Sequence, residues 1–310
     1  MQTVNPFQAD PMSLLDQFVI AEHLDPDYKK TALTYFFPLA ASLADQQRSL
    51  KRPMLIAING CQGSGKSTLA ALLAQSLGTF HQLNAVAFSI DDFYLTRAER
   101  QALADRVHPL LATRGVPGTH DIELLKYTLS ALLAGAAPVV APRFNKAIDD
   151  RAPRSEWHQI GAAPDIIILE GWCVATGAQC DEALREPVNR LETEQDPDGT
   201  WRRYVNQQVR DAYEPLYRAI DVSIMLRAPS FDCVYQWRLE QEQKLARKLP
   251  PGADRSAVMN AEQVGEFISF YQRLTEHALR TLAEDVDWLY ELDATRHIVS
   301  SCGPTARHFA

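Results

Sequence analysis

The sequence lacks the patterns of a membrane protein, of a disulfide-bonded secreted protein and of a repeat protein. No apolar run approaches the roughly 20 residues that a membrane-spanning helix needs. Residues 1–11 contain no basic segment followed by an apolar run, so they do not resemble a signal peptide. The five cysteines follow no CxxC spacing, which indicates free thiols rather than a disulfide or metal framework. We therefore expect a cytoplasmic protein with no membrane partner.

An excess of basic residues is also absent. The formal net charge is −8, with 31 basic side chains against 39 acidic ones, which argues against a general surface for nucleic acid or anionic membranes. An anionic ligand must therefore be held by a local basic cluster. The length of 310 residues and the hydrophobic content of 46% suit a globular protein with one large core. They leave the oligomeric state open.

Short apolar runs alternate with helical patterns over residues 51–310. The runs predict buried strands at Met54–Asn59, Ala85–Ile90, Asp165–Leu169, Val222–Leu226 and Val286–Leu292. Apolar residues at helical spacing predict helices over Ser67–Leu77, which we expect to stop at Gly78, and over Trp201–Ile220, Phe231–Leu249 and Gly265–Ala283. This order predicts a three-layer α/β/α domain with a mainly parallel five-stranded sheet.

The first 50 residues form a separate pattern. Helical spacing there is broken near Pro26 and Pro38, and we expect an N-terminal helical extension of two helices packed on the core, followed by a catalytic domain over residues 51–310. Two stretches of that domain, at about 106–121 and 138–157, are rich in Pro, Gly, Arg and His and have weak periodicity. Long irregular insertions of this kind are typical of binding loops.

Gly60-Cys-Gln-Gly-Ser-Gly-Lys-Ser67 fits the pattern GxxxxGK[ST], directly after a predicted strand and directly before a predicted helix. Glycines let backbone N–H groups turn inward around phosphates, and the N-terminus of the next helix adds positive charge. Lys66 would reach the β- and γ-phosphates and the Ser67 hydroxyl would bind Mg²⁺. We therefore predict a P-loop NTPase fold that binds ATP through Gly60, Cys61, Gln62, Gly63, Ser64, Gly65, Lys66, Ser67 and Thr68.

Acidic residues end two other predicted strands. Asp91 and Asp92 follow the second strand, and Glu170 follows the third in the manner of a Walker B acid. Carboxylates at this edge point into the crevice where such sheets bind ligands, so they can hold Mg²⁺ or accept a proton from an attacking hydroxyl. Alternatively, Asp91 and Asp92 form a turn or cap a helix. We expect Ser67, Asp91 and Glu170 to hold the metal, and either Asp91 or Asp92 to be the base.

These motifs together resemble the phosphoribulokinase, uridine kinase and pantothenate kinase group of P-loop kinases, in which the Asp of a D-x-F motif acts as base. Asp91 occupies that position here. Further stretches narrow the resemblance to the D-glycerate 3-kinase family, over about residues 50–295. They are Arg114–Asp121, Pro142–Lys146, Asp150–Ala152 with Trp157, Glu170–Trp172, Trp201–Asn206 and Val234–Arg238 with Glu242. Phe144 and Asn145 stand where the family often has Tyr and Asp. The resemblance implies transfer of a phosphoryl group from ATP to D-glycerate.

Glycerate carries one carboxylate, and a site for it needs a nearby cation, for which the fork of an arginine is well suited. The two irregular stretches supply several basic residues, of which Arg151 is our first candidate for the carboxylate. Alternatively these are solvated loop charges, and His120 is a hydrogen-bonded structural histidine. The predicted acceptor-binding residues are Asp92, Tyr94, Arg114, His120, Asp121, Arg143, Lys146 and Arg151.

The predicted helix Phe231–Leu249 and the Pro250-Pro-Gly252 turn that follows form a segment at about 231–252. The segment carries Arg238, Lys244, Arg247 and Lys248. In related kinases this position is a lid, whose cations would neutralise charge on the transferred phosphoryl group. A solvated helix face is the alternative. We predict Lys66, Asp91, Glu170 and Arg238 as catalytic residues and Arg247 as an ATP contact. A kinase for another small metabolite, or a non-catalytic ATP-binding regulator, remains as the competing function.

Overall fold

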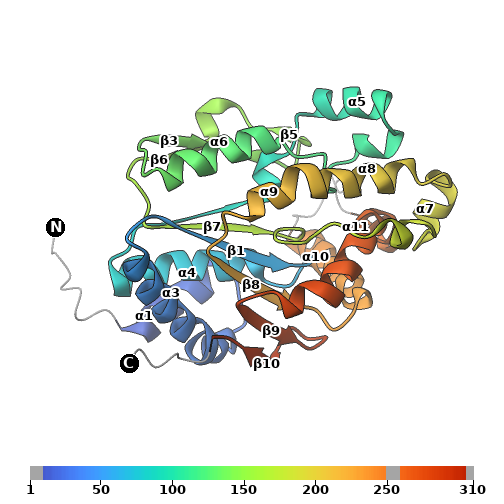
Figure 1. Cartoon of the computed structure of the whole chain (residues 1–310). Helices are drawn as coiled ribbons and strands as arrows, with labels where there is room; N and C mark the ends of the chain where they lie inside the picture. Colours follow the sequence, from blue (N-terminus) through green and yellow to red (C-terminus); the bar gives the residue numbers. More distant parts are fainter. Residues whose placement is uncertain (1–9, 249–258, 305–310) are drawn as a thin grey trace.

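The computed structural model describes residues 10–248 and 259–304, and shows a six-stranded sheet between two layers of helices (Figure 1). The strands of this sheet are β1 (Met54–Gly60), β2 (Ala85–Ser89), β7 (Ile166–Gly171), β8 (Val222–Arg227), β9 (Trp288–Leu292) and β10 (Ile298–Cys302). Two small antiparallel ladders pair β3 (Val139–Ala141) with β6 (His158–Ile160), and β4 (Phe144–Asn145) with β5 (Asp150–Arg151). The α-helices are α1 (Pro11–Ala21), α2 (Tyr28–Thr31), α3 (Phe37–Leu50), α4 (Lys66–His81), α5 (Arg97–Arg106), α6 (Ile122–Leu133), α7 (Arg190–Gln195), α8 (Thr200–Gln208), α9 (Glu214–Tyr217), α10 (Phe231–Lys248) and α11 (Ala261–Thr281).

The predicted α/β fold is confirmed, and the sheet has one strand more than predicted. Its order is β10-β9-β8-β1-β7-β2, and all neighbouring pairs are parallel except β9 with β10. The added strand, β10, is a mostly exposed edge strand of sequence Ile-Val-Ser-Ser-Cys. A polar edge strand of this kind lacks the apolar run of a buried strand, so the sequence pattern did not show it.

Alternation along β1 explains why the sheet is buried on both faces. Met54, Ile56 and Ile58 belong to one hydrophobic cluster, which α3 and α4 complete. Leu55 and Ala57 belong to a second cluster, which α6 and α11 complete from the other face. Figure 1 shows α3 and α4 on one side of the strands and α6, α8 and α9 on the other. Successive residues of a strand point to opposite faces, so a strand that is apolar throughout requires a helix layer on each side.

Two helix boundaries differ from the prediction. The helix α4 continues through Gly78 to His81. The left-handed residue that ends it is Gln82, with φ +58°, so the position expected for glycine is filled by another residue. The prediction of a break at Pro38 was wrong. A π-helical segment, Ala32–Phe36, precedes α3 and widens the turn ahead of the proline, so the helix continues to Leu50.

The N-terminal helices pack on the same core as the sheet. Leu15 and Phe18 of α1 and Leu39 and Leu43 of α3 are almost fully buried in the cluster that also contains β1. The irregular stretch at about 138–157 contains β3, β4 and β5, and the stretch at about 106–121 contains a short 3₁₀ segment, Pro109–Ala112. Among the described residues, no helix combines the length and the apolar character that crossing a membrane requires.

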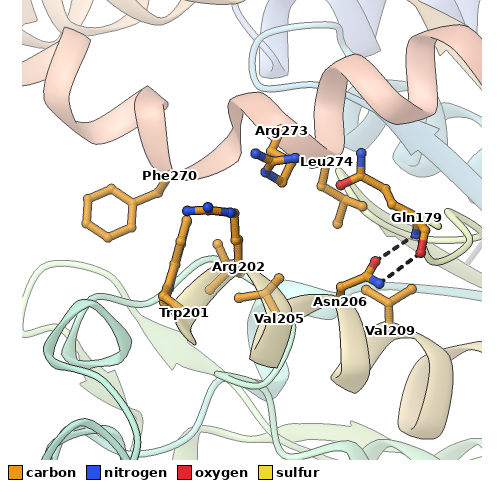
Figure 2. A pocket seen from close by; sticks show the side chains of 10 residues that line it. Gln179, Trp201, Arg202, Val205, Asn206, Val209, Phe270, Arg273 and Leu274 are labelled. Atoms are coloured by element: carbon orange, nitrogen blue, oxygen red, sulfur yellow. Dashed lines mark hydrogen bonds between the residues drawn. The ribbon is translucent and has the colours of Figure 1, made fainter. Parts of the chain in front are cut away.

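A small cavity of about 20 Å³ lies between α8 and α11 (Figure 2). It is large enough for about one water molecule. The two charged residues that line it are engaged: Arg202 bonds Asp196 at 3.0 Å and Arg273 bonds Glu192 at 2.6 Å. These buried pairs tie α7, α8 and α11 together, and they identify the cavity as a packing feature of the helical layer.

Candidate active site

The phosphate-binding loop leaves the end of β1 and enters α4. Gly63 and Gly65 have φ values of +80° and +93°, in the left-handed region that favours glycine. A Cβ on Gly60 would lie 2.4 Å from the Ser64 hydroxyl oxygen, so the loop could not close with a larger residue there. Lys66 and Ser67 lie in the first turn of α4, where the positive end of the helix dipole adds to the lysine charge.

Glu170 faces this first turn from the adjacent strand β7. The Ser67 hydroxyl donates a hydrogen bond of 2.8 Å to Glu170 Oε1, and Lys66 Nζ lies 3.9 Å from Glu170 Oε2. Glu170 is only 5% exposed, and its Oε2 accepts no hydrogen bond from the described residues. A buried carboxylate oxygen without a hydrogen-bond donor, beside a hydroxyl, is the donor set that Mg²⁺ prefers.

Asp91 lies just past the carboxyl end of β2, whose Ser89 pairs in register with Glu170. It is in a 3₁₀ segment, Ile90–Phe93, which the Ser89 hydroxyl caps by accepting from the Asp91 N–H. Asp91 Oδ1 accepts from the Tyr94 hydroxyl at 2.9 Å, and Asp91 Oδ2 lies 2.7 Å from Lys146 Nζ. Asp91 is therefore fixed at the same sheet edge as the phosphate-binding loop.

The charges around Asp91 keep it ionised. Burial alone would raise its pKa, but the positive charges of Lys146 and Lys66 outweigh burial and lower the pKa to about 2. Asp92 differs, because burial raises its pKa and its Oδ1 accepts from the Phe144 N–H at 3.2 Å. Asp91 thus interacts electrostatically with Lys66 of the phosphate-binding loop. Asp92 instead accepts a hydrogen bond from the β4–β5 ladder.

Tyr94 and His120 form a stacked pair, with ring centroids 4.4 Å apart. Both are buried. His120 Nδ1 lies 2.7 Å from the Tyr213 hydroxyl, which itself accepts from the Gly118 N–H at 3.0 Å. The tautomer of the imidazole sets which of these two groups donates. Burial lowers the pKa of His120 to about 4, so the imidazole is neutral at neutral pH. It packs against Tyr94 and hydrogen-bonds with Tyr213.

A buried neutral histidine makes stability depend on pH. The unfolded pKa of histidine is about 6.5, and the folded pKa of His120 is about 4. The unfolded chain therefore binds more protons between these values, and stability falls as the pH drops from about 6.5 to 4, by up to about 3 kcal/mol. We expect His120→Asn to keep an acceptor for Tyr213 and to flatten this part of the curve. Urea unfolding of both proteins from pH 4 to 7 measures it, and parallel curves would contradict the assignment.

The structure separates the predicted basic residues into two groups. Arg151 donates to Asp121 at 3.0 Å and to the Tyr94 carbonyl at 3.1 Å, and Arg114 bonds Asp149. Both side chains are mostly buried. Arg151, our first candidate for the acceptor carboxylate, therefore contacts the Tyr94 segment and Asp121, and its contact with the acceptor stays a prediction.

Lys146 and Arg143 are the more accessible cations. The Lys146 side chain is 60% exposed although it pairs with Asp91, and Arg143 is exposed on the approach to β4. An ion pair between an exposed lysine and a carboxylate is weak, because water screens the two charges. Lys146 can therefore exchange that partner for an incoming anion.

Arg238 lies on α10, as predicted. Its guanidinium pairs with Glu242 one turn along, donates to Gln241 Oε1 at 3.1 Å and lies over the Phe267 ring at 5.4 Å. The side chains of Lys244, Arg247 and Lys248 lie outside the described residues, as does Pro250-Pro-Gly252, so the ATP contact predicted for Arg247 stays a prediction.

Two residues near the site were not predicted. Tyr271 of α11 packs on Trp172 at 4.8 Å, and its hydroxyl would lie 2.3 Å from a Cβ on Gly115, which explains the glycine of the Arg114–Asp121 stretch. That glycine was the available signal for a close neighbour. Arg296 donates from Nε to the Gly63 carbonyl at 2.9 Å. No motif in the sequence marks it.

A phosphate-binding loop on a parallel sheet, with acids at the ends of two further strands, is the arrangement of a P-loop nucleotide-binding protein, and kinases are one class of these proteins. The comparisons agree with this class. The chain is 34% identical over 252 residues to an uncharacterized kinase, mug58, of Schizosaccharomyces pombe, covering 79% of this chain and 87% of that protein. It is 30% identical over 240 residues to the chloroplastic D-glycerate 3-kinase of Arabidopsis thaliana, covering 74% of this chain and 48% of the relative. The chain belongs to the same kinase family as mug58 and has the P-loop kinase fold.

A solved kinase structure matches most of the chain, and a family model matches a shorter segment. The solved D-glycerate 3-kinase of Cryptococcus neoformans superposes with a TM-score of 0.71 at 25% identity, covering 86% of this chain and 97% of that one. The Zeta toxin family model matches residues 40–99. That segment spans β1, the phosphate-binding loop, α4, β2 and Asp91, so the match covers the part of the fold that handles phosphate.

Proposed function

We propose that this kinase transfers the γ-phosphoryl group of ATP to the primary hydroxyl of D-glycerate, giving 3-phosphoglycerate and ADP. The observation that carries the proposal is the pairing of Asp91 with an exposed cation, Lys146, at 2.7 Å. A base and a cation side by side suit an acceptor that has both a hydroxyl and a carboxylate. The names of two relatives, both D-glycerate 3-kinases, support the same acceptor.

In this mechanism, the loop Gly60–Thr68 holds the phosphates of ATP, and Lys66 neutralises charge on the β- and γ-phosphates. Asp91 accepts the proton of the acceptor hydroxyl while the new O–P bond forms and the bond from phosphorus to the β-phosphate oxygen breaks. Arg238 and Arg247 of α10 stabilise the transferred group. Asp91 does not need a raised pKa for this role, because an ionised carboxylate is ready to accept the proton.

The residues at the loop fit a magnesium ion. Ser67 and Glu170 are bonded to each other, and Glu170 Oε2 is buried without a hydrogen bond among the described residues. Asp91, at the end of the next strand, would be the third oxygen ligand. Mg²⁺ bound there would neutralise phosphate charge. Among the described residues, no group of three or more His, Cys, Asp or Glu side chains is placed to hold a metal ion. The protein would therefore supply few ligands of its own, as is usual where nucleotide phosphates complete the shell.

The acceptor would lie beside Asp91, between a charged side and an aromatic side. Lys146 and Arg143 would bind the acceptor carboxylate, and Tyr94 and His120 would line the pocket around Asp91. The remaining predicted acceptor-binding residues would hold these four side chains in position. Their partners are the β4–β5 ladder for Asp92, Asp149 for Arg114, and each other for Asp121 and Arg151.

An acceptor screen tests the proposal. Purified protein is supplied with MgATP and with D-glycerate, L-glycerate, pantothenate or uridine in turn, and ADP release is measured, with ³¹P NMR of the product. We expect D-glycerate to give a kcat/KM at least about 100-fold above uridine, because a neutral acceptor leaves Lys146 without a new partner. A clear preference for another acceptor would refute glycerate. ATP binding without acceptor-stimulated turnover would indicate a regulator.

A further inference from the structure

The turn between β9 and β10 carries a residue in a strained backbone conformation. Arg296 has φ +71°, in the left-handed region that side chains other than glycine rarely adopt. The turn is closed by Asp293, whose Oδ1 accepts from the N–H groups of Thr295 and His297 at 2.8 and 2.9 Å. Its carbonyl accepts from the Arg296 N–H at 3.0 Å. These hydrogen bonds fix the backbone conformation of Arg296. A strained backbone conformation persists only where surrounding contacts stabilise it, so the contacts of the Arg296 side chain are relevant.

The Arg296 side chain reaches two other parts of the molecule. Its Nε donates to the Gly63 carbonyl at 2.9 Å, and its Nη2 lies 2.5 Å from Glu240 Oε2 on α10. The guanidinium also lies 5.3 Å from the centre of the Trp237 ring. Trp237 Nε1 in turn donates to the Ala294 carbonyl of the same turn at 2.8 Å. The phosphate-binding loop, α10 and the β9–β10 turn thus form a closed set of contacts.

The contact with Gly63 fixes a peptide of the phosphate-binding loop at both ends. The Gly63 carbonyl accepts from Arg296, and the N–H of the same peptide, on Ser64, donates to the Cys61 carbonyl at 3.2 Å. Trp237 packs closely against this part of the loop, because a Cβ added to Gly63 would lie only 2.7 Å from the Trp237 Cβ. A charge-assisted hydrogen bond to a carbonyl is stronger than a neutral one. Arg296 therefore restrains the loop in the conformation that surrounds phosphate.

We propose that Arg296 is a positioning residue that couples the phosphate-binding loop to α10, the helix that carries Arg238. It holds the loop through Gly63 and holds the helix through Glu240, so the loop and the Arg238 guanidinium keep a fixed relation. The inference rests on the proposed function only in that the protein binds ATP at this loop. It does not depend on which acceptor is phosphorylated.

A matched pair of variants separates this role from simple stabilisation of the hairpin. Arg227 of β8 also pairs with a glutamate, Glu291, at 2.9 Å and donates to a carbonyl, that of Leu279, at 3.1 Å. The exposed fractions of the two ion pairs are similar, 35% and 39% for Arg227–Glu291 and 28% and 40% for Arg296–Glu240. Arg227→Met thus removes a comparable Arg–Glu pair whose recorded partners lie on β9 and α11, outside the phosphate-binding loop.

The measurement is the Kd of MgADP by titration calorimetry, in the absence of any acceptor, with the Tm of each variant. We expect Arg296→Met to weaken ADP binding at least about tenfold, because a charge-assisted bond to the loop is lost. Arg227→Met should change Kd less than about twofold with a similar loss in Tm. Equal effects of the two variants on Kd, or an Arg296→Met protein that binds ADP within twofold of wild type, would overturn the proposal.

Arg296→Lys carries the test if Arg296→Met does not fold. A single ammonium lacks the planar fork and cannot reach Gly63 and Glu240 together. We expect it to weaken ADP binding at least about threefold at a Tm near that of wild type. Wild-type affinity in Arg296→Lys would overturn the proposal. A wrong acceptor assignment would leave both results unchanged, because no acceptor is present.

Discussion

Asp91→Asn is expected to lower kcat by about 10³-fold while leaving the Kd of MgADP within a few-fold of the wild-type value. The amide keeps the size of the side chain and still accepts from the Tyr94 hydroxyl, which now donates to Asp91 at 2.9 Å. It cannot take a proton from the acceptor hydroxyl. Steady-state ADP release with saturating D-glycerate measures kcat, and calorimetry measures nucleotide binding.

Asp92→Asn is the matched control. Its carbonyl oxygen can still accept from the Phe144 N–H, so the β4–β5 ladder should stay in place. We expect a loss in kcat of less than about tenfold. A larger loss for Asp92→Asn than for Asp91→Asn would reverse the assignment of the base. Full activity in Asp91→Asn would remove the base from the mechanism.

Lys146→Met is expected to raise the KM for D-glycerate by about 30-fold, with the KM for ATP nearly unchanged, because a charged hydrogen bond to the acceptor carboxylate is lost. Lys146 suits this role since its side chain is 60% exposed and its recorded partner is Asp91. The methionine keeps the length of the side chain and removes its charge.

Lys126→Met on α6 provides the control for this variant. Lys126 is another partly exposed lysine, 36% exposed, and it pairs with Glu123 at 2.8 Å. Its loss should leave both KM values as in wild type. An unchanged KM for D-glycerate in Lys146→Met, or an equal rise for ATP and D-glycerate, would show that Lys146 does not bind the acceptor.

Local sequence patterns determined most of the fold. The phosphate-binding loop could be predicted from spacing alone, because its parts are contiguous in the sequence. They are the run Met54–Asn59, the glycines of the loop and the lysine that begins α4. The limits of local reasoning appear at Pro38 and at β10. A π-helical segment directly before α3 lets the helix continue past the proline. The edge strand is too polar to show the apolar run of a buried strand.

The roles of the charged residues could not be predicted in the same way. Arg114 and Asp149 are 35 residues apart, and Arg151 and Asp121 are 30 apart, so the sequence shows the charges without their partners. Only the fold reveals that these two arginines are engaged and that Lys146 is accessible. Arg296 lies 233 residues from Gly63, and no local pattern connects a hairpin turn with a phosphate-binding loop.

A crystal structure with ADP, Mg²⁺ and D-glycerate tests the central claim most directly. The account predicts that the primary hydroxyl of glycerate lies about 3 Å from Asp91 and that its carboxylate has replaced Asp91 as the partner of Lys146. A complex in which Asp91 points away from the acceptor, or in which the glycerate carboxylate binds elsewhere while Lys146 stays on Asp91, would contradict it.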